Sequence, residues 1–256
     1  SAYLGFSGPF LMTQQNGIWS SNSFIGLGIT EHHHPIPLEK EDIIFQKGFA
    51  SHLEELILYD GLEIKKQLVF LSGHTVLIKY TFTNKRNNKR TLPIHSRNYG
   101  LFSKNLQLTS NENELIINSS KSTAIGHVLF PLGIKLDIED GIYISVLNDI
   151  NIEPNETKEI VISQSFIFPE YSWKVEKELI NKIDFDSVLS ARKVEKNAEL
   201  KSLISNKRDQ FSDNKYSEVL AKALLTLQNN WRIPAGEIKH EGLFPSYHYK
   251  WFNGFW

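Results

Sequence analysis

Cysteine is absent from the 256 residues, which excludes disulfide bonds, thiolate zinc sites and a cysteine nucleophile. An excess of charge of one sign is also lacking, because 28 Lys and Arg offset 29 Asp and Glu to a formal net charge of -1. A chain without a basic field is not expected to bind nucleic acid. No apolar run approaches the ~18 residues that a membrane-spanning helix requires. The composition therefore favours a soluble protein and leaves its compartment open.

Cofactor and metal motifs are equally scarce. His32-His33-His34 precedes Pro35, and although His32 and His34 would share one face of a strand, the sequence identifies no third ligand for zinc. A polar turn is the better interpretation of this run. The pair Gly26 and Gly28 lacks the third glycine and the following helix that a dinucleotide-binding loop requires. We therefore expect neither a cofactor nor a metal.

Strand signals fill the first ~170 residues. Asp60-Gly61 and Asp140-Gly141 each separate two alternating or β-branched runs, and Asp-Gly favours a type I′ hairpin turn because both residues tolerate positive φ. Residues 75–83 and 159–168 are further alternating runs of this kind. Many strands at short spacing, without an intervening helical pattern, predict a mainly β fold built as a large antiparallel sandwich.

The pattern changes after Pro169. Residues 173–207 contain no Gly or Pro and are rich in Lys, Glu, Leu and Ile, which predicts a helical linker in which Asp184 or Asp186 caps a second helix. The next helix is the clearest in the chain, and Asp213 or Asn214 can cap it. Its apolar side chains form one stripe that needs a packing partner, and they are Tyr216, Val219, Leu220, Ala223, Leu224, Leu227 and Trp231.

The last 21 residues form an irregular tail that is dense in aromatic side chains. Such a tail would expose an apolar patch if it ended the protein, so we expect a truncated chain. Glu237 and Glu241 are the only acids in it, and between Gly236 and Gly242 no rigid element fixes their separation. Solvated loop acids are the better interpretation of both. The tail's aromatics are Phe244, Tyr247, Tyr249, Trp251, Phe252, Phe255 and Trp256.

Three motifs carry a family resemblance: Asn230-Trp231-Arg232-Ile233-Pro234-Ala235-Gly236, Phe244-Pro245-Ser246 and Trp251-Phe252-Asn253-Gly254-Phe255-Trp256. Together they resemble the entry to the catalytic domain of bacterial family 63 glycoside hydrolases, relatives of processing α-glucosidase I. The helix over residues 218–229 resembles the helix that opens that domain. The match covers about a tenth of the chain, and the rest agrees in architecture only.

The resemblance implies a β-super-sandwich over residues 1–170, a helical linker over 171–212 and the truncated start of an (α/α)6 barrel over 213–256. It implies an inverting α-glucosidase-like enzyme for α-linked oligosaccharides, in the bacterial periplasm or cytoplasm. In the family a Trp-Asp pair with the general acid follows the last Trp within a few residues, and the general base lies far downstream. This chain, which ends at Trp256, would thus contain no catalytic residue and be inactive alone.

The resemblance also assigns roles within the tail. Sugar rings stack their C–H faces on aromatic rings, and Trp251 and Trp256 are expected to do so in the complete enzyme. Trp231 and Phe255 are assigned to packing, and Phe244 can be core of the barrel as well. The expected substrate-binding residues are Arg232, Tyr249, Trp251, Phe252, Gly254 and Trp256. Two alternatives stay open: a stand-alone carbohydrate-binding or interaction module, and a disaccharide phosphorylase whose phosphate site would also lie in the missing barrel.

Overall fold

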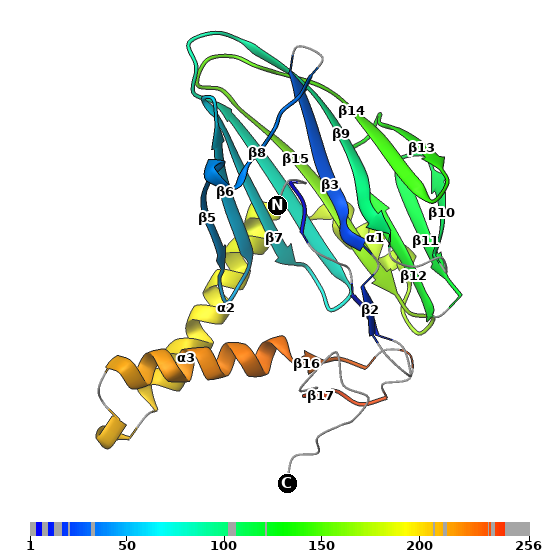
Figure 1. Cartoon of the computed structure of the whole chain (residues 1–256). Helices are drawn as coiled ribbons and strands as arrows, with labels where there is room; N and C mark the ends of the chain where they lie inside the picture. Colours follow the sequence, from blue (N-terminus) through cyan, green and yellow to red (C-terminus); the bar gives the residue numbers. More distant parts are fainter. Residues whose placement is uncertain are drawn as a thin grey trace.

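The structure is a computed structural model, and the mainly β fold predicted from the sequence is confirmed. A β-sandwich is followed by three α-helices (Figure 1). None of the helices in the described part of the chain is long and apolar enough to cross a membrane. The structure describes residues 4–6, 10–12, 17–19, 21–31, 34–101, 106–120, 122–206, 208–211, 214–234, 236 and 239–243.

The larger sheet of the sandwich has eight antiparallel strands in the order β10-β11-β12-β15-β8-β7-β6-β5. Its middle strands, β15 and β8, pair along their length although they are far apart in the sequence. The strands are β5 (Ile43–Gly48), β6 (Leu53–Tyr59), β7 (Leu62–Phe70), β8 (Thr75–Asn84), β10 (Leu106–Asn111), β11 (Glu114–Ser119), β12 (Ser122–Leu129) and β15 (Thr157–Ile167).

The smaller sheet has five antiparallel strands in the order β13-β14-β9-β3-β4. They are β3 (Ser21–Glu31), β4 (His34–Pro35), β9 (Arg90–Leu101), β13 (Lys135–Glu139) and β14 (Ile142–Ile152). Two short strands, β1 (Phe10–Met12) and β2 (Gly17–Trp19), pair with each other, and a 3-10 turn, η1, covers Lys40–Asp42.

Both Asp-Gly hairpins form as predicted. Asp60 and Gly61 connect β6 to β7 with φ of 46° and 72°, and Asp140 and Gly141 connect β13 to β14 with 49° and 76°. Positive φ at both central residues is the requirement of a type I′ turn, whose twist matches that of the flanking strands. Each hairpin therefore sets the register of its two strands locally.

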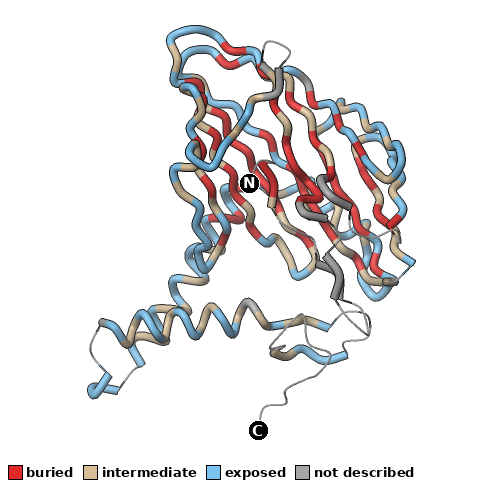
Figure 2. The backbone as a smooth tube through the Cα atoms, viewed as in Figure 1, coloured by how far each residue is buried: buried red, intermediate tan, exposed pale blue. Residues whose placement is uncertain are grey.

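The core lies between the two sheets, where the buried residues of both meet (Figure 2). Alternate residues of each strand point inward, so Leu62 and Ile64 of β7 face Tyr143 and Leu147 of β14 across one continuous cluster. Full burial of such a side chain contributes roughly 1.5–3 kcal/mol. This cluster makes the sandwich the stable body on which the helical part rests.

Three helices follow the last strand: α1 (Trp173–Lys182), α2 (Phe185–Ser205) and α3 (Asn214–Asn229), with a 3-10 turn, η2, over Asp209–Phe211. The predicted linker is thus two helices. Asp184 caps the second, because its carboxylate accepts a 2.9 Å hydrogen bond from the Ser187 backbone N–H. Asp213, a candidate cap for the next helix, lies outside the described residues, and α3 begins at Asn214.

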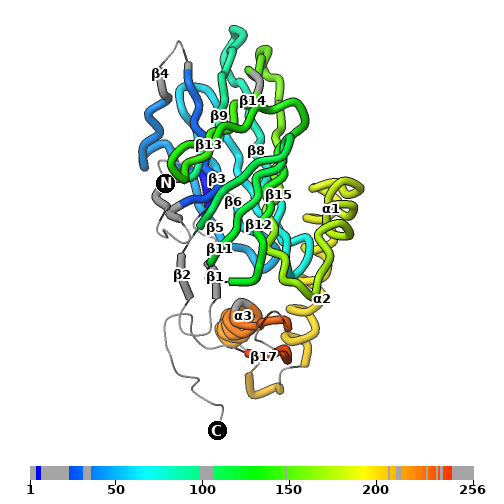
Figure 3. Tube along the Cα trace, turned by 90° about the vertical axis from the view of Figure 1, so that its right-hand side faces the viewer, coloured from blue at the N-terminus to red at the C-terminus, as the bar shows by residue number. Residues whose placement is uncertain are grey.

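The first turns of α2 pack on the outer face of the eight-stranded sheet (Figure 3). Phe185, Val188 and Leu189 close over Val69 and Leu77 in a second, smaller apolar cluster. These strand residues point away from the main core, so β7 and β8 are apolar on both faces here.

The third helix contacts α2, and Gln228 of α3 donates a hydrogen bond to Glu199 of α2. This contact leaves part of the predicted apolar stripe uncovered, since Val219 and Leu227 stay exposed. The expectation that the stripe needs a packing partner is therefore met only in part by α2.

Candidate functional site

The segment after α3, residues 231–243, carries the described part of the predicted site, and we call it the entry segment. It begins with β16 (Trp231–Arg232), which pairs antiparallel with β17 (Gly242–Leu243). The hairpin lies below the sandwich in Figure 1, at the far end of α3 from η2. It leads directly into the aromatic tail.

Two hydrogen bonds fasten the entry segment to the residues that follow β15. The Tyr171 hydroxyl donates to the Pro234 carbonyl over 2.7 Å. The Gly236 backbone N–H donates to Glu170 Oε1 over 2.6 Å. Hydrogen bonds from its own backbone and from Gly236 lower the pKa of Glu170, which keeps this carboxylate ionised as an acceptor.

Two glycines allow the entry segment to approach the sandwich closely. A Cβ added to Gly73, in the β7–β8 turn, would lie 2.2 Å from Cδ1 of Ile233, so the missing side chain makes room for the isoleucine. Gly236 has a φ of +57°, and a Cβ there would lie 2.6 Å from the ring of Phe168. The close fit at both places fixes where the segment crosses the end of the sandwich.

The same β7–β8 turn is tied to α1. Ser72 donates a 2.5 Å hydrogen bond from its hydroxyl to Glu176 of α1. The ring of His74 lies 3.9 Å from that of Tyr171, centroid to centroid, and burial lowers the pKa of His74. The turn, α1 and the entry segment therefore meet in one joint, in which a neutral His74 supports the tyrosine that binds Pro234.

Arg232 is the one expected substrate-binding residue within the described part of the chain. Its side chain is half-buried, and burial lowers the pKa of the guanidinium. Nη1 donates a 2.7 Å hydrogen bond to the Trp231 carbonyl. Trp231, assigned to packing, is 46% exposed, and its indole N–H donates to Glu241 Oε2 over 3.3 Å. Glu241, expected as a solvated loop acid, thus accepts a bond from a neighbouring indole.

The remaining predicted site residues lie outside the described residues. They include both tryptophans expected to stack on sugar, so their placement stays a prediction. Within the described ranges, no group of three or more His, Asp or Glu lies together in a way that could hold a metal ion. The residues outside are His32, His33, Glu237, Phe244, Tyr249, Trp251, Phe252, Gly254, Phe255 and Trp256.

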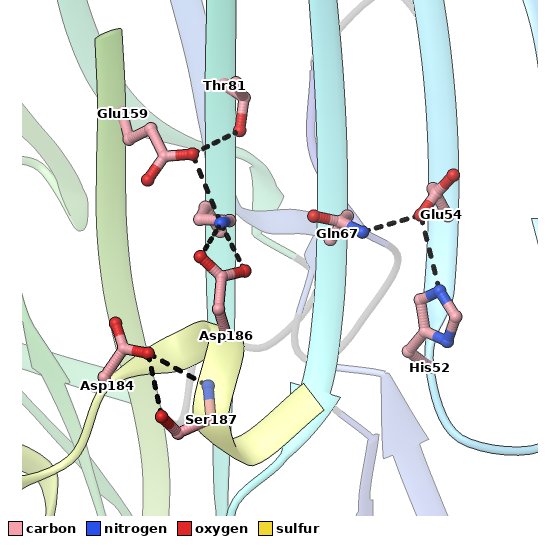
Figure 4. A network of polar contacts seen from close by, with 9 residues as sticks. His52, Glu54, Gln67, Thr81, Glu159, Asp184, Asp186 and Ser187 are labelled. Atoms are coloured by element: carbon pink, nitrogen blue, oxygen red, sulfur yellow. Dashed lines mark hydrogen bonds and ion pairs between the residues drawn. The ribbon is translucent and has the colours of Figure 1, made fainter. Parts of the chain in front are cut away.

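Polar clusters on the outer face of the large sheet were not anticipated from the sequence. Lys79 of β8, almost fully buried, donates to Asp186 of α2 over 2.6 and 2.8 Å and lies 3.2 Å from Glu159 of β15 (Figure 4). Burial lowers the pKa of Lys79, but the bonds to the two carboxylates outweigh it and raise the pKa overall. The sequence signal for this cluster was a lysine within a strand whose neighbouring residues point alternately inward and outward.

Two further clusters lie on the same face. His127 of β12 is hydrogen-bonded to Glu114 of β11 over 2.7 Å, and its ring stacks on that of Trp173. The Glu114 carboxylate also accepts a 2.6 Å hydrogen bond from Lys177 of α1. Glu54 links Gln67 to His52 in a third cluster (Figure 4). Each carboxylate here has cationic or amide partners, so these clusters tie elements together.

Comparison with known proteins follows the fold. No protein-family profile matches the chain, and no curated protein matches it. Similar structures include a chain from the human microbiome whose proposed identity is a kojibiose phosphorylase (10% identity, TM-score 0.45, 73% of this chain and 29% of that chain). Heparan sulfate lyase HepC from Pedobacter heparinus is 10% identical with a TM-score of 0.38, and the match covers 60% of this chain and 25% of that chain. The Slr1438 protein from Synechocystis is 8% identical with a TM-score of 0.38, and the match covers 65% of this chain and 98% of that chain. The chain thus spans less than a third of the phosphorylase and of the lyase.

Proposed function

We propose that this chain is the N-terminal, non-catalytic part of an inverting α-glucosidase-like glycoside hydrolase that acts on α-linked oligosaccharides. In this proposal residues 1–170 are the super-sandwich, 171–212 the linker and 213–256 the start of an (α/α)6 catalytic domain. The general acid and base belong to the part of the protein beyond Trp256, so the chain alone does not hydrolyse its substrate.

The observation that supports the proposal is the joint between the sandwich and the entry segment. Tyr171, Glu170 and Gly73 hold this segment against a rigid β body immediately before the aromatic tail. Catalytic geometry tolerates little displacement, and a residue is best positioned when its support is packed and hydrogen-bonded. The exposed stripe of α3, with Val219 and Leu227, gives the following helices of a barrel an apolar surface.

The proposal assigns the chain's own residues to substrate positioning. Trp251 and Trp256 stack on glucosyl rings, and Tyr249, Phe252 and Gly254 line the same pocket. Arg232 hydrogen-bonds sugar hydroxyls or orients a carboxylate of the catalytic domain. Hydrolysis with inversion requires two carboxyl groups roughly 6.5–9.5 Å apart, one protonated to donate to the leaving oxygen and one ionised to activate water.

The test compares the product of the complete gene with the 256-residue chain. Release of glucose from α-linked di- and oligosaccharides is measured with and without inorganic phosphate. We expect phosphate-independent release of glucose by the complete protein and none by the chain. Sugar phosphate formed only with phosphate would instead identify a phosphorylase. A complete protein inactive in both assays, together with sugar binding by the chain, would identify a stand-alone binding module.

The tryptophan assignment is tested separately in the complete protein. Trp251→Ala removes a stacking face, so kcat/KM should fall about 5- to 150-fold, if stacking on a sugar ring is worth the ~1–3 kcal/mol of stacking on a nucleic-acid base. Leu132→Ala changes an exposed residue of the β12–β13 loop and serves as the control. If both variants were equally active, Trp251 would not be part of the substrate site.

A further inference from the structure

The outer face of the five-stranded sheet carries an aliphatic row that the proposed function does not use. Ile142, Ile144 and Val146 alternate along β14 with buried Tyr143, Ser145 and Leu147 and are 39%, 41% and 53% exposed. Such side chains in the middle of a strand are normally covered by another element or replaced by polar residues. Three neighbouring exposed β-branched residues on one face form a contiguous apolar patch. Within the described residues, no helix packs on this face, since α1 and α2 lie against the other sheet (Figure 3).

The strands on either side of the aliphatic row carry opposite charges. On β13, Asp137 is opposite Ile144 and Glu139 is opposite Ile142. On β9, Arg97 is opposite Ile144. Directly opposed residues of antiparallel strands share a face. On this face β13 thus carries two carboxylates and Lys135 on one side of the row, and β9 carries Arg97 on the other, each one strand spacing away.

A glycine shelf extends the same face beyond β9. Gly26 and Gly28 of β3 are opposite Arg97 and His95. A Cβ at Gly28 would lie 2.2 Å from the imidazole of His95, so this ring lies flat over the shelf. The face is consequently low and smooth on its basic side, which allows another surface to approach.

This arrangement is self-complementary. A two-fold axis running along β14 exchanges the two flanking strands, so that β13 of one copy lies over β9 of the other and β14 lies over β14. Asp137 then meets Arg97 of the second copy, twice, and the aliphatic rows meet each other. Lys135, opposite Val146 on β13, lies 3.2 Å from Asp137 of its own chain, so Asp137 is shared between this lysine and Arg97 of the second copy.

We propose that the outer face of the five-stranded sheet is the interface of a two-fold symmetric dimer of this chain. Only β13, β14 and β9 overlap in this arrangement, and because β13 is 5 residues long the overlap is roughly 300 Å² per copy, the size of a weak, transient contact. Two sheets facing each other pack aligned at about 10 Å, as the layers of a sandwich do. We therefore expect a weak, reversible dimer with a dissociation constant on the order of 100 µM.

Sedimentation velocity of the 256-residue chain, up to about 200 µM, measures this association. The weight-average mass should rise from 29.4 kDa towards twice that value. Ile144→Asp buries two charges at the two-fold axis and should raise the dissociation constant at least tenfold. Leu227→Asp is the matched control, because Leu227 on α3 is an aliphatic residue that is 48% exposed, close to the 41% of Ile144. A chain that remains at 29.4 kDa throughout would overturn the proposal.

A charge exchange identifies the interface in particular. Asp137→Arg and Arg97→Asp each bring like charges together in a dimer of identical copies, and each should weaken it. A mixture of the two variants restores both attractive contacts and should dimerise as the unchanged chain does. Thermal unfolding of each variant establishes that it is folded. Association that Leu227→Asp abolishes, and that Ile144→Asp and Asp137→Arg leave intact, would place the contact on α3 and contradict the proposal.

Discussion

Lys66 and Glu55, directly opposed on β7 and β6, form an ion pair that is closed off from water on the inner face of the large sheet. Each side chain is 1% exposed. The ammonium also donates to the Gly5 carbonyl over 2.8 Å and lies 4.8 Å from the centre of the Phe6 ring. Burial lowers the pKa of Lys66, and the carboxylate acts against that effect. Residues near the N-terminus thus complete the solvation of a charge that the core would otherwise leave uncompensated.

Removing one partner of this pair should destabilise the protein more than removing both. Lys66→Met leaves a buried carboxylate without its cation and should cost about 3–5 kcal/mol of unfolding free energy. The double variant Lys66→Met with Glu55→Leu should recover most of that loss, because apolar side chains of similar volume fill the site. Urea denaturation of the single and double variants measures the difference. If the double variant is less stable than the single one, the pair contributes net stability.

A single hydroxyl should control the joint below the sandwich. Tyr171→Phe removes the donor to the Pro234 carbonyl, a bond worth about 1 kcal/mol, while the ring contact with His74 stays. We expect amide hydrogen exchange in the β16–β17 hairpin to accelerate about fivefold, with global stability nearly unchanged. Tyr59→Phe, on β6, is the control. Unchanged exchange in the hairpin would mean that Glu170 and Ile233 alone hold the segment.

At the scale of elements, the attachment of α2 depends on a small apolar cluster. Leu189→Ala should lower the unfolding free energy by about 2 kcal/mol, at the low end for buried leucines because the cluster is small. Val194→Ala, on the same helix but exposed, should change it by less than about 0.5 kcal/mol. Chemical denaturation followed by circular dichroism compares the two. Equal effects would show that α2 packs differently from the arrangement described.

The elements that sequence predicted well are those specified by neighbouring residues. Asp60-Gly61 and Asp140-Gly141 fix their turns locally, and alternation identifies the flanking strands. The sequence left open whether Asp184 or Asp186 caps the second helix of the linker. Asp184 is the cap, and Asp186 instead accepts a hydrogen bond from Lys79 of a distant strand. Such long-range pairing has no local signature. For the same reason, the joint that holds Ile233 against Gly73 could not be read from either residue alone.

At the scale of the molecule, acid should weaken the fold before its carboxylates begin to titrate. Burial is the largest cause that lowers the pKa of His52, His74, His95 and His127 below 6.5. Below that pH the unfolded chain binds more protons than the folded one, so the unfolding free energy falls as pH falls. The loss should extend from about pH 7 to 5, above the range where Glu114 and Glu199, whose pKa values are also lowered, contribute.

Urea denaturation across this pH range tests the expectation. His127→Gln keeps a hydrogen-bonding side chain beside Glu114 and should flatten the dependence. The matched substitution His240→Gln changes an exposed histidine near the chain's end and should leave the slope as it is. A stability that is constant between pH 7 and 5 would contradict the assignment of neutral, buried histidines.

The pairing of β8 with β15 also has a consequence for how the chain is made. Ser165 pairs with Thr75 across 90 residues, and Thr157 with Thr83 across 74. At a translation rate of about 5–20 residues per second, β8 leaves the ribosome roughly 4–18 s before its partner. During that interval one edge of the β5–β6–β7–β8 meander is open to other nascent chains. Co-expression of a holdase chaperone that covers this edge should therefore raise the yield of folded protein.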